Sequence, residues 1–227
     1  MLRQCAEYVC EHWREPDNGI WEYRDKRRHY THSRLMCWVA LDRLLKMQLR
    51  GQLGGIKVER CEAERARIRQ EIEQHAWNPK LQTYTEAFGS DVADASAFLL
   101  AYHGLERANS ERMQRTHKRI REKLVPRTGL VYRNERSLQL REGAFALCSF
   151  WEVDFLSRAE KLAEAREILK TALSYANDVD LFAEEIDAAT GDALGNFPQA
   201  FTHLGLINAA LALRDSEGPA RRLNRES

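Results

Sequence analysis

Helical periodicity runs almost without a break along this chain, and it alternates between two kinds of helix. We expect helices over residues 1–14, 31–49, 57–76, 91–104, 110–124, 143–157, 160–176 and 198–214. The first, third, fifth and seventh are amphipathic and highly charged, as in 58–65 (VERCEAER). The second, fourth, sixth and eighth are apolar on nearly all sides, as in 144–151 (AFALCSFW). Because a helix that is apolar all round belongs in the interior, we expect outer and inner helices to alternate.

The connections between these helices alternate as well. The loops that lead from an outer to an inner helix are long and cover 15–30, 77–90, 125–142 and 177–197. The links from an inner to the next outer helix are mostly shorter, and the inner helices recur about every 55 residues. Antiparallel hairpins repeated in this way build a solenoid or a closed α/α toroid. The long loops should therefore emerge at one end, beneath the positive ends of the inner helix dipoles.

Composition excludes several classes of function. A chain of 227 residues with 44% hydrophobic residues can form one compact domain, and a net charge of +1 gives no reason to expect nucleic acid. The cysteines are odd in number and mostly lie in apolar helical runs: Cys5, Cys10, Cys37, Cys61 and Cys148. We expect reduced thiols, no metal site and no cofactor. Without an apolar signal core or a stretch of transmembrane length, we expect a soluble cytoplasmic protein that does not bind membranes.

Two of the long loops carry acidic side chains that could do chemistry. The first contains Trp21 beside Glu22, and a carboxyl next to an indole in a dry, concave site can have the raised pKa of a general acid. The last contains Glu184 and Glu185, followed by Asp187. Glycine precedes a short extended stretch in 17–21, 127–132 and 189–193, which suits a pocket lined by loops on a rigid scaffold. The alternative is a helical-repeat scaffold with decorated loops and no catalysis.

Several segments resemble glycoside hydrolase family 15, which contains glucoamylases and related bacterial trehalases. They are 19–24 (GIWEYR), 28–43 (RHYTHSRLMCWVALDR), 88–96 (FGSDVADAS), 142–151 (EGAFALCSFW), 183–187 (AEEID) and 195–204 (GNFPQAFTHL). The resemblance covers essentially the whole chain, in the right order. It implies an all-α fold, the (α/α)6 toroid of six helical hairpins, and hydrolysis of α-glucosidic bonds with inversion of configuration.

The resemblance also implies roles for single residues. Glu22 corresponds to the general acid and Glu184 to the general base, with Glu185 as a rival for the base or as a sugar-binding carboxylate. Inverting enzymes hold two such carboxyls roughly 6.5–9.5 Å apart, so that a water molecule fits between one of them and the sugar.

Four further residues are candidates for binding an α-glucoside or oligosaccharide substrate. Trp21 resembles the family's sugar-stacking aromatic residue, and Arg133 corresponds to an arginine that hydrogen-bonds the substrate. Arg24 and His29 are plausible sugar ligands, although a salt bridge or cap that locks the loop explains them equally well.

The chain departs from the family pattern in length. It contains four hairpins, which resemble the C-terminal two-thirds of the catalytic domain, so we expect residues 1–227 to form an incomplete toroid with its active-site loops on one rim. Exposed inner helices would then favour self-association or contact with the missing N-terminal portion. We expect this chain alone to be a poor catalyst. The alternative is a non-catalytic sugar-binding or subunit-interaction remnant of the same family.

Overall fold

The computed structural model describes residues 1–126 and 128–218, and it divides the chain into two compact units. Unit 1 comprises Met1–Val92 and unit 2 comprises Ala93–Ser227. Arg127, which belongs to one of the glycine loop motifs, and residues 219–227 lie outside the described residues. Each unit has its own buried core.

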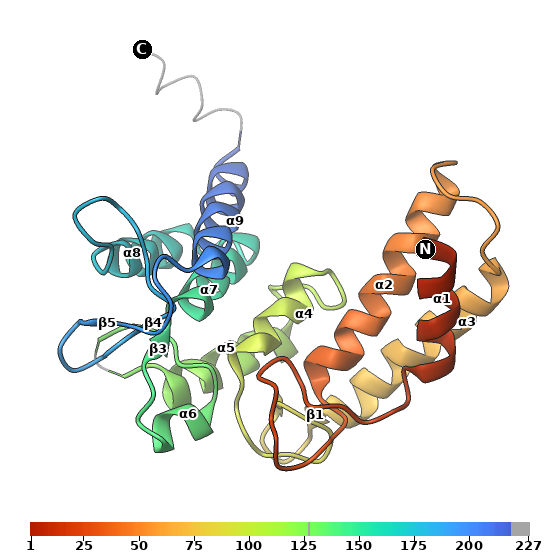
Figure 1. Cartoon of the computed structure of the whole chain (residues 1–227), viewed down its shortest axis with the longest axis horizontal. Coiled ribbons are helices and arrows are strands. Elements are labelled where there is room, and N and C mark those ends of the chain that lie inside the picture. Colours follow the sequence, from red (N-terminus) through yellow and green to blue (C-terminus); the bar gives the residue numbers. More distant parts are fainter. Residues whose placement is uncertain (127, 219–227) are drawn as a thin grey trace. The chain divides into compact units, whose positions relative to one another are not determined.

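Unit 1 is built from three helices, with α2 packed against the other two (Figure 1). They are α1 (Leu2–His12), α2 (Thr31–Leu49) and α3 (Val58–Glu71), followed by the π-helical turn η1 (Ile72–Ala76). Leu35, Trp38, Leu41 and Leu45 of α2 are all buried. An apolar helix of this kind is covered on more than one side, which is why the charged α1 and α3 lie outside it. The short antiparallel strands β1 (Trp77–Asn78) and β2 (Thr83–Tyr84) close the unit.

A buried carboxylate ties α1 to α3. Glu64 accepts hydrogen bonds from Nε1 of Trp13 at 2.8 Å, from Arg14 at 3.0 Å and from Arg67 at 2.6 Å. Burial alone would raise the pKa of Glu64, but the Trp13 hydrogen bond and the charges of Arg14 and Arg67 outweigh it and lower that pKa. The carboxylate is therefore held in its ionised form between the two helices.

Unit 2 has α7 as its central helix. Its elements are η2 (Ala95–Phe98), α4 (Leu99–Tyr102), α5 (Glu111–Leu124), α6 (Glu135–Gln139), β3 (Ala144–Phe145), α7 (Ala146–Arg158), α8 (Leu162–Leu173), β4 (Glu185–Ile186), β5 (Ala193–Leu194) and α9 (Ala200–Ser216). Helices α8 and α9 both pack on α7 (Figure 1), and Phe150 and Phe155 of α7 are fully buried. The strands form one antiparallel sheet in the order β3-β4-β5.

The predicted helices agree with the structure in the strongly periodic segments and differ where local contacts override the pattern. The helix expected over 91–104 is a 3-10 turn and a single α-helical turn that begin at Ala95, because Asp94 is extended and caps the turn by accepting from the Ser96 amide at 2.7 Å. The helix expected from 143 begins at Ala146, because the two preceding residues pair with β4. Helix α6 and the two-residue strands were not predicted, since they are too short to show a period. None of the described helices is long and apolar enough to cross a membrane.

Candidate active site

The loop that carries Glu22 is closed at its base by a backbone bridge. The amides and carbonyls of Asp17 and Arg28 exchange hydrogen bonds of 3.0 and 2.9 Å. The Asp17 carboxylate also accepts from the Gly19 amide at 2.6 Å and from the Ser33 hydroxyl at 2.7 Å. A side chain β-carbon at Gly19 would lie 2.9 Å from the Tyr30 ring, so only glycine fits there. These contacts fix the loop to the first turn of α2.

Glu22 lies at the tip of this loop in an unusual backbone conformation. Its φ of 53° is in the left-handed region, and its amide donates to the Gly19 carbonyl at 3.2 Å. Non-glycine residues held in this region are strained and cluster at functional sites. Glu22 and Arg24 are exposed, whereas Trp21 is half-buried. The dry surroundings expected for Glu22 from the sequence are therefore not formed by the described residues.

His29 is held by a buried arginine at the base of the loop. Arg34 of α2 is almost fully buried; its guanidinium donates to Nδ1 of His29 and to the Glu15 carbonyl, the latter at 3.1 Å. Burial lowers the pKa of Arg34, against the charges of Cys37, Asp17 and Glu71. Of the two roles considered for His29, sugar ligand or loop lock, the structure shows the contact that locks the loop. Its ring remains exposed, and its role as a sugar ligand stays a prediction.

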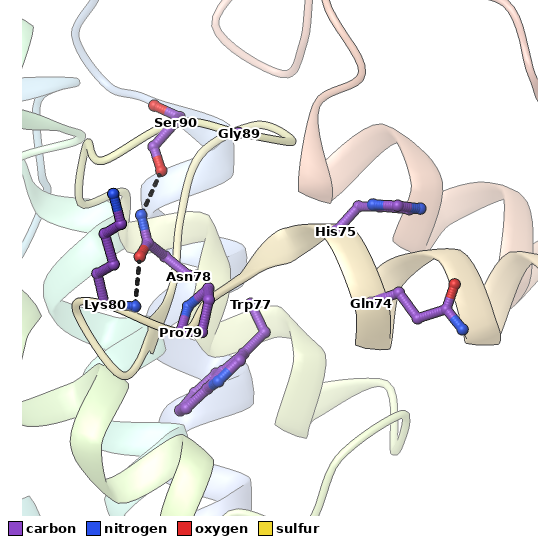
Figure 2. Close-up of a pocket in the computed structure, with 8 residues that line it drawn as sticks. All are labelled: Gln74, His75, Trp77, Asn78, Pro79, Lys80, Gly89 and Ser90. Carbon is purple, nitrogen blue, oxygen red and sulfur yellow. Dashed lines mark hydrogen bonds between the residues drawn. The ribbon is translucent and has the colours of Figure 1, made fainter.

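Unit 1 also contains a cavity of about 340 Å³ beside the β1–β2 turn (Figure 2). It is lined by Gln74, His75, Trp77, Asn78, Pro79, Lys80, Gly89 and Ser90. The Asn78 amide group donates to the Ser90 carbonyl at 3.0 Å and accepts from the Lys80 amide at 3.0 Å, so it links the β1–β2 turn to the loop that contains Ser90 (Figure 2). The predicted site residues are not part of this lining.

In unit 2, the short sheet places Glu184 and Glu185 in different surroundings. Glu185 belongs to β4 and pairs with Phe145 on one side and Leu194 on the other. Its carboxylate forms an ion pair with Arg133 at 3.0 Å and accepts from the Gly143 amide at 3.1 Å. Glu142 also forms an ion pair with Arg133. Glu185 is therefore tied into a charged network.

Glu184 precedes β4 and is held by an amide instead. Its carboxylate accepts from the Asn196 side chain at 2.9 Å and from the Asn196 backbone amide at 3.2 Å. Its own amide donates to the Asn196 carbonyl at 2.9 Å. Among the described residues, the ion pairs of this loop involve Glu185 and not Glu184. Among the residues that the structure describes, Asn196 orients Glu184 and no cation forms an ion pair with it.

Burial and neighbouring charge shift the pKa values of Glu185 and Tyr132. Burial raises the pKa of Glu185; the Arg133 charge opposes this, while the carboxylates of Glu142 and Glu184 add to it. Burial also raises the pKa of Tyr132, together with the charges of Asp187 and Glu185. Glu142 and Glu185 thus form an acidic cluster with Arg133 between them.

Two glycines allow the backbone to approach the two carboxylates. A β-carbon at Gly143 would lie 2.8 Å from that of Glu185 and 3.1 Å from the Ile186 carbonyl oxygen. Gly195 has a φ of 74°, and a β-carbon there would lie 3.0 Å from Glu184. Side chains at these positions would push the carboxylates away.

The acidic cluster borders a cavity of about 580 Å³ within unit 2, a volume typical of small-molecule sites. Its lining is Pro126, Thr128, Tyr132, Leu138, Arg141, Glu142, Gly143, Asp187, Ala188, Ala189 and Leu194. Sequence reasoning assigned no role to Tyr132, Glu142 or Asn196, although each lies in or beside a segment that it singled out. For Glu142 and Asn196 the signal in the sequence was a polar side chain next to a loop glycine. Among the described residues there is no cluster of three or more metal-ligating side chains.

The structure thus gathers the predicted residues into two groups. Trp21, Glu22, Arg24 and His29 share one loop of unit 1. Arg133 and Glu185 form an ion pair in unit 2, with Glu184 adjacent.

The chain matches the model of a known protein family. The model of the glycosyl hydrolases family 15 matches residues 1–166 and 159–211. The chain belongs to this family. The resemblance inferred from the sequence motifs is therefore confirmed.

The chain is similar to several trehalases. It is 38% identical over 226 residues to a trehalase of Mycolicibacterium smegmatis and 37% identical over 226 residues to one of Mycobacterium tuberculosis. Each match covers 97% of this chain and 33% of the trehalase. A trehalase of Thermoplasma volcanium is 33% identical over 207 residues, or 90% of this chain and 33% of that protein. The chain thus spans about a third of the length of these relatives.

Solved structures show the fold. The family 15 glucoamylase from Hypocrea jecorina has a TM-score of 0.76 at 11% identity, with 93% of this chain and 46% of that chain covered. A glycosidase in complex with glucose has a TM-score of 0.79 at 16% identity, with 92% and 58% covered. The predicted fold class, an all-α chain of paired helices forming part of an (α/α)6 toroid, is confirmed.

Proposed function

We propose that the chain is part of an inverting glycoside hydrolase that acts on α-glucosidic bonds, with trehalose as its first candidate substrate. Family membership and the trehalase relatives support this proposal. We further propose that residues 1–227 belong to one catalytic domain. Since the chain spans about a third of those relatives, full turnover would require family segments that it does not span.

The observation that carries the mechanism is the difference between Glu184 and Glu185. A general base must be ionised and free to take a proton from water. Arg133 forms an ion pair with Glu185, whereas among the described residues Glu184 accepts hydrogen bonds from the Asn196 amides. We therefore assign the base to Glu184, with Glu185 positioning Arg133.

Glu22 is the complementary general acid in this proposal. The loop contacts at Asp17 and Gly19 fix its backbone, and the neighbouring Trp21 would shield its carboxyl and stack on a sugar ring once substrate is bound. Arg24, His29 and Arg133 are the proposed hydrogen-bonding groups for sugar hydroxyls.

The roles are tested with single variants on a fusion of this chain to the preceding part of the M. smegmatis trehalase. Glu184→Gln should lower kcat for trehalose by ~10²–10⁴-fold, because the water loses its base. Glu185→Gln should mainly raise KM, and Glu164→Gln, on the exposed surface of α8, should change neither. A larger kcat loss in Glu185→Gln than in Glu184→Gln would reverse the assignment.

The acid is tested by changing the leaving group. Glu22→Gln should suppress hydrolysis of trehalose by ~10²–10⁴-fold but affect α-glucosyl fluoride much less, since fluoride needs little protonation to depart. Proton NMR of the fluoride reaction should show β-glucose first, as inversion requires. Initial α-glucose would exclude the base role of Glu184.

The exposure of Glu22 favours one alternative, a non-catalytic sugar-binding module. That reading predicts binding of trehalose without turnover, both for residues 1–227 and for the fusion. Turnover by the fusion that is lost in Glu184→Gln would exclude it.

A further inference from the structure

The segment directly before the two adjacent glutamates is held by the start of helix α9. Gln199, the N-cap residue of α9, donates its backbone amide to the Phe182 carbonyl at 2.9 Å. The Thr202 hydroxyl donates to the Ala183 carbonyl at 3.2 Å. Phe182, Ala183 and Thr202 are all buried, so water does not satisfy these backbone groups and the helix must. The first turn of α9 therefore fixes the chain just before Glu184.

His203 supplies a third hydrogen bond to the same segment. Its Nε2 accepts from the Phe182 amide at 3.3 Å, and its Nδ1 is 2.7 Å from the Gln199 carbonyl oxygen. The rings of Phe182 and His203 also meet edge to face, with their centroids 5.8 Å apart. Both backbone groups of Phe182 are thus bonded to the first turn of α9.

The two partners of the His203 ring decide which nitrogen carries the proton. A backbone carbonyl can only accept, so Nδ1 must be the donor; a backbone amide can only donate, so Nε2 must be without a proton. Both contacts therefore require the neutral Nδ1–H tautomer. In a protonated ring Nε2 becomes a donor as well, and it would face the N–H group of Phe182. Protonation thus breaks this hydrogen bond and leaves a buried amide without its acceptor.

We propose that His203 is a positioning residue for the general base, and that it holds the base in place only while its ring is neutral. The proposal rests on the assignment of that base to Glu184. Phe182 lies two positions before Glu184, and the Glu184 amide donates to the Asn196 carbonyl, which lies three positions before the Gln199 cap. Release of Phe182 would shift the carboxylate relative to the water that it must activate, and small displacements of a catalytic group cost rate.

Charged side chains around α9 have partners other than His203. Helices α7 and α8 pack on α9, and the segment with the two glutamates is bonded to its start. The pairs in these elements are Glu152 with His117 and Arg121, Asp154 with Arg158, Arg166 with Glu217, Glu184 with Asn196, and Glu185 with Arg133. The other charged residues of α8, Glu164, Glu167 and Lys170, are exposed to solvent. In the described part of the chain His203 forms no ion pair, so its protonation acts through the bond to Phe182.

Nuclear magnetic resonance on residues 1–227 tests this contact without any measurement of activity. At about pH 8 the ring nitrogens of His203, assigned by comparison with His203→Gln, should show the neutral Nδ1–H tautomer. As the pH falls, the Phe182 amide resonance should shift with the same midpoint as the His203 ring. An Nε2–H tautomer, or a Phe182 amide that does not follow the ring, would overturn the proposal.

Kinetics of the fusion to the M. smegmatis trehalase segment test the effect on catalysis. His203→Phe keeps a flat ring but offers no acceptor, and it should lower kcat for trehalose by ~10–10²-fold with little change in KM. His203→Gln keeps an uncharged acceptor for the Phe182 amide, so it should recover most of this loss. Equal kcat losses in the two variants would show that His203 acts only by packing, and would overturn the proposal.

The pH profile of kcat gives the second readout. In the unmodified fusion kcat should fall, as the pH is lowered, with the midpoint measured for the His203 ring. His203→Gln should lose this step because glutamine stays neutral, whereas His12→Gln, on α1 of unit 1, should keep it. A step that persists in His203→Gln would contradict the proposal. A fusion without activity at any pH would contradict the proposed function instead, and the resonance titration would still decide the role of His203.

Discussion

Glu184 and Glu185 are adjacent and chemically identical, yet their carboxylates have different partners. Residues next to each other near a strand point to opposite faces, so Glu185 reaches Arg133 and Glu184 reaches Asn196. The Glu185 carboxylate is therefore paired with a cation, and the Glu184 carboxylate is oriented by amide groups. At this scale, function depends on which neighbour each side chain meets.

Gly143→Ala tests how closely the backbone must approach Glu185. The added methyl group would meet the Ile186 carbonyl oxygen at 3.1 Å, and a backbone atom within a sheet cannot easily move away. We expect a loss of about 1–3 kcal/mol in the free energy of unfolding, measured with urea. Gly54→Ala, where no atom lies within 4 Å, is the control and should change stability by less than about 0.5 kcal/mol. Equal effects would remove the steric explanation.

Glu64→Gln tests the buried carboxylate between α1 and α3. Because the pKa of Glu64 is lowered in the folded state, its contribution to stability is present above the ordinary glutamate pKa of 4.5 and is lost as the pH falls through the folded value. The variant should lose about 1–3 kcal/mol at neutral pH and progressively less in acid. Glu62→Gln, exposed on the same helix, is the control. A loss that is independent of pH would contradict the assignment.

Helices α7 and α9 show that an apolar helix need not be buried on all sides. The small residues of α9 bring it close to α7, and its large residues are left outside. Apolar composition predicted an inner helix, but composition does not say which face meets which neighbour. The close contact between α7 and α9 therefore requires a residue without a side chain at position 205.

Gly205→Val should separate these two helices. Its side chain would overlap Leu147 and the β-carbon of Phe150, and the loss should be about 2–4 kcal/mol in the unfolding free energy. Ala210→Val, at an exposed position of the same helix, measures the helix propensity of valine alone and should cost no more than about 0.7 kcal/mol. Similar losses in both variants would show that the contact between α7 and α9 is loose.

The whole molecule consists of two compact units with separate cores, and its tryptophans report them unequally. Trp13, Trp21, Trp38 and Trp77 belong to unit 1, and Trp151 belongs to unit 2. Fluorescence therefore follows mainly the first unit, whereas circular dichroism follows the helices of both.

We expect the two units to respond separately to local changes. Gly205→Val should lower the urea midpoint seen by circular dichroism more than the midpoint seen by fluorescence, because the substitution lies in unit 2. Glu64→Gln should do the reverse. Coincident shifts at both probes would show that the chain unfolds as one cooperative unit.

Residue types and their spacing were enough to predict the family, the position of several helices and the loops that carry the candidate residues. Periodicity of apolar residues is a local property, so α2 was placed at residues 31–49 as the structure has it. Its motifs also marked Glu22, Glu184 and Arg133 as candidates. These features need only residue types and spacing.

Tertiary structure decided the rest, because it depends on contacts between residues distant in the chain. The pairing of β3 with β4 joins segments about 40 residues apart, and no local pattern reveals such two-residue strands. The pairing of Arg133 with Glu185, rather than with Glu184, follows from that sheet. The exposure of large apolar side chains of α9, such as Leu204 and Ile207, accompanies the close fit of Gly205 against α7. Which face of a helix or strand is buried depends on this packing, and the local sequence pattern does not specify it.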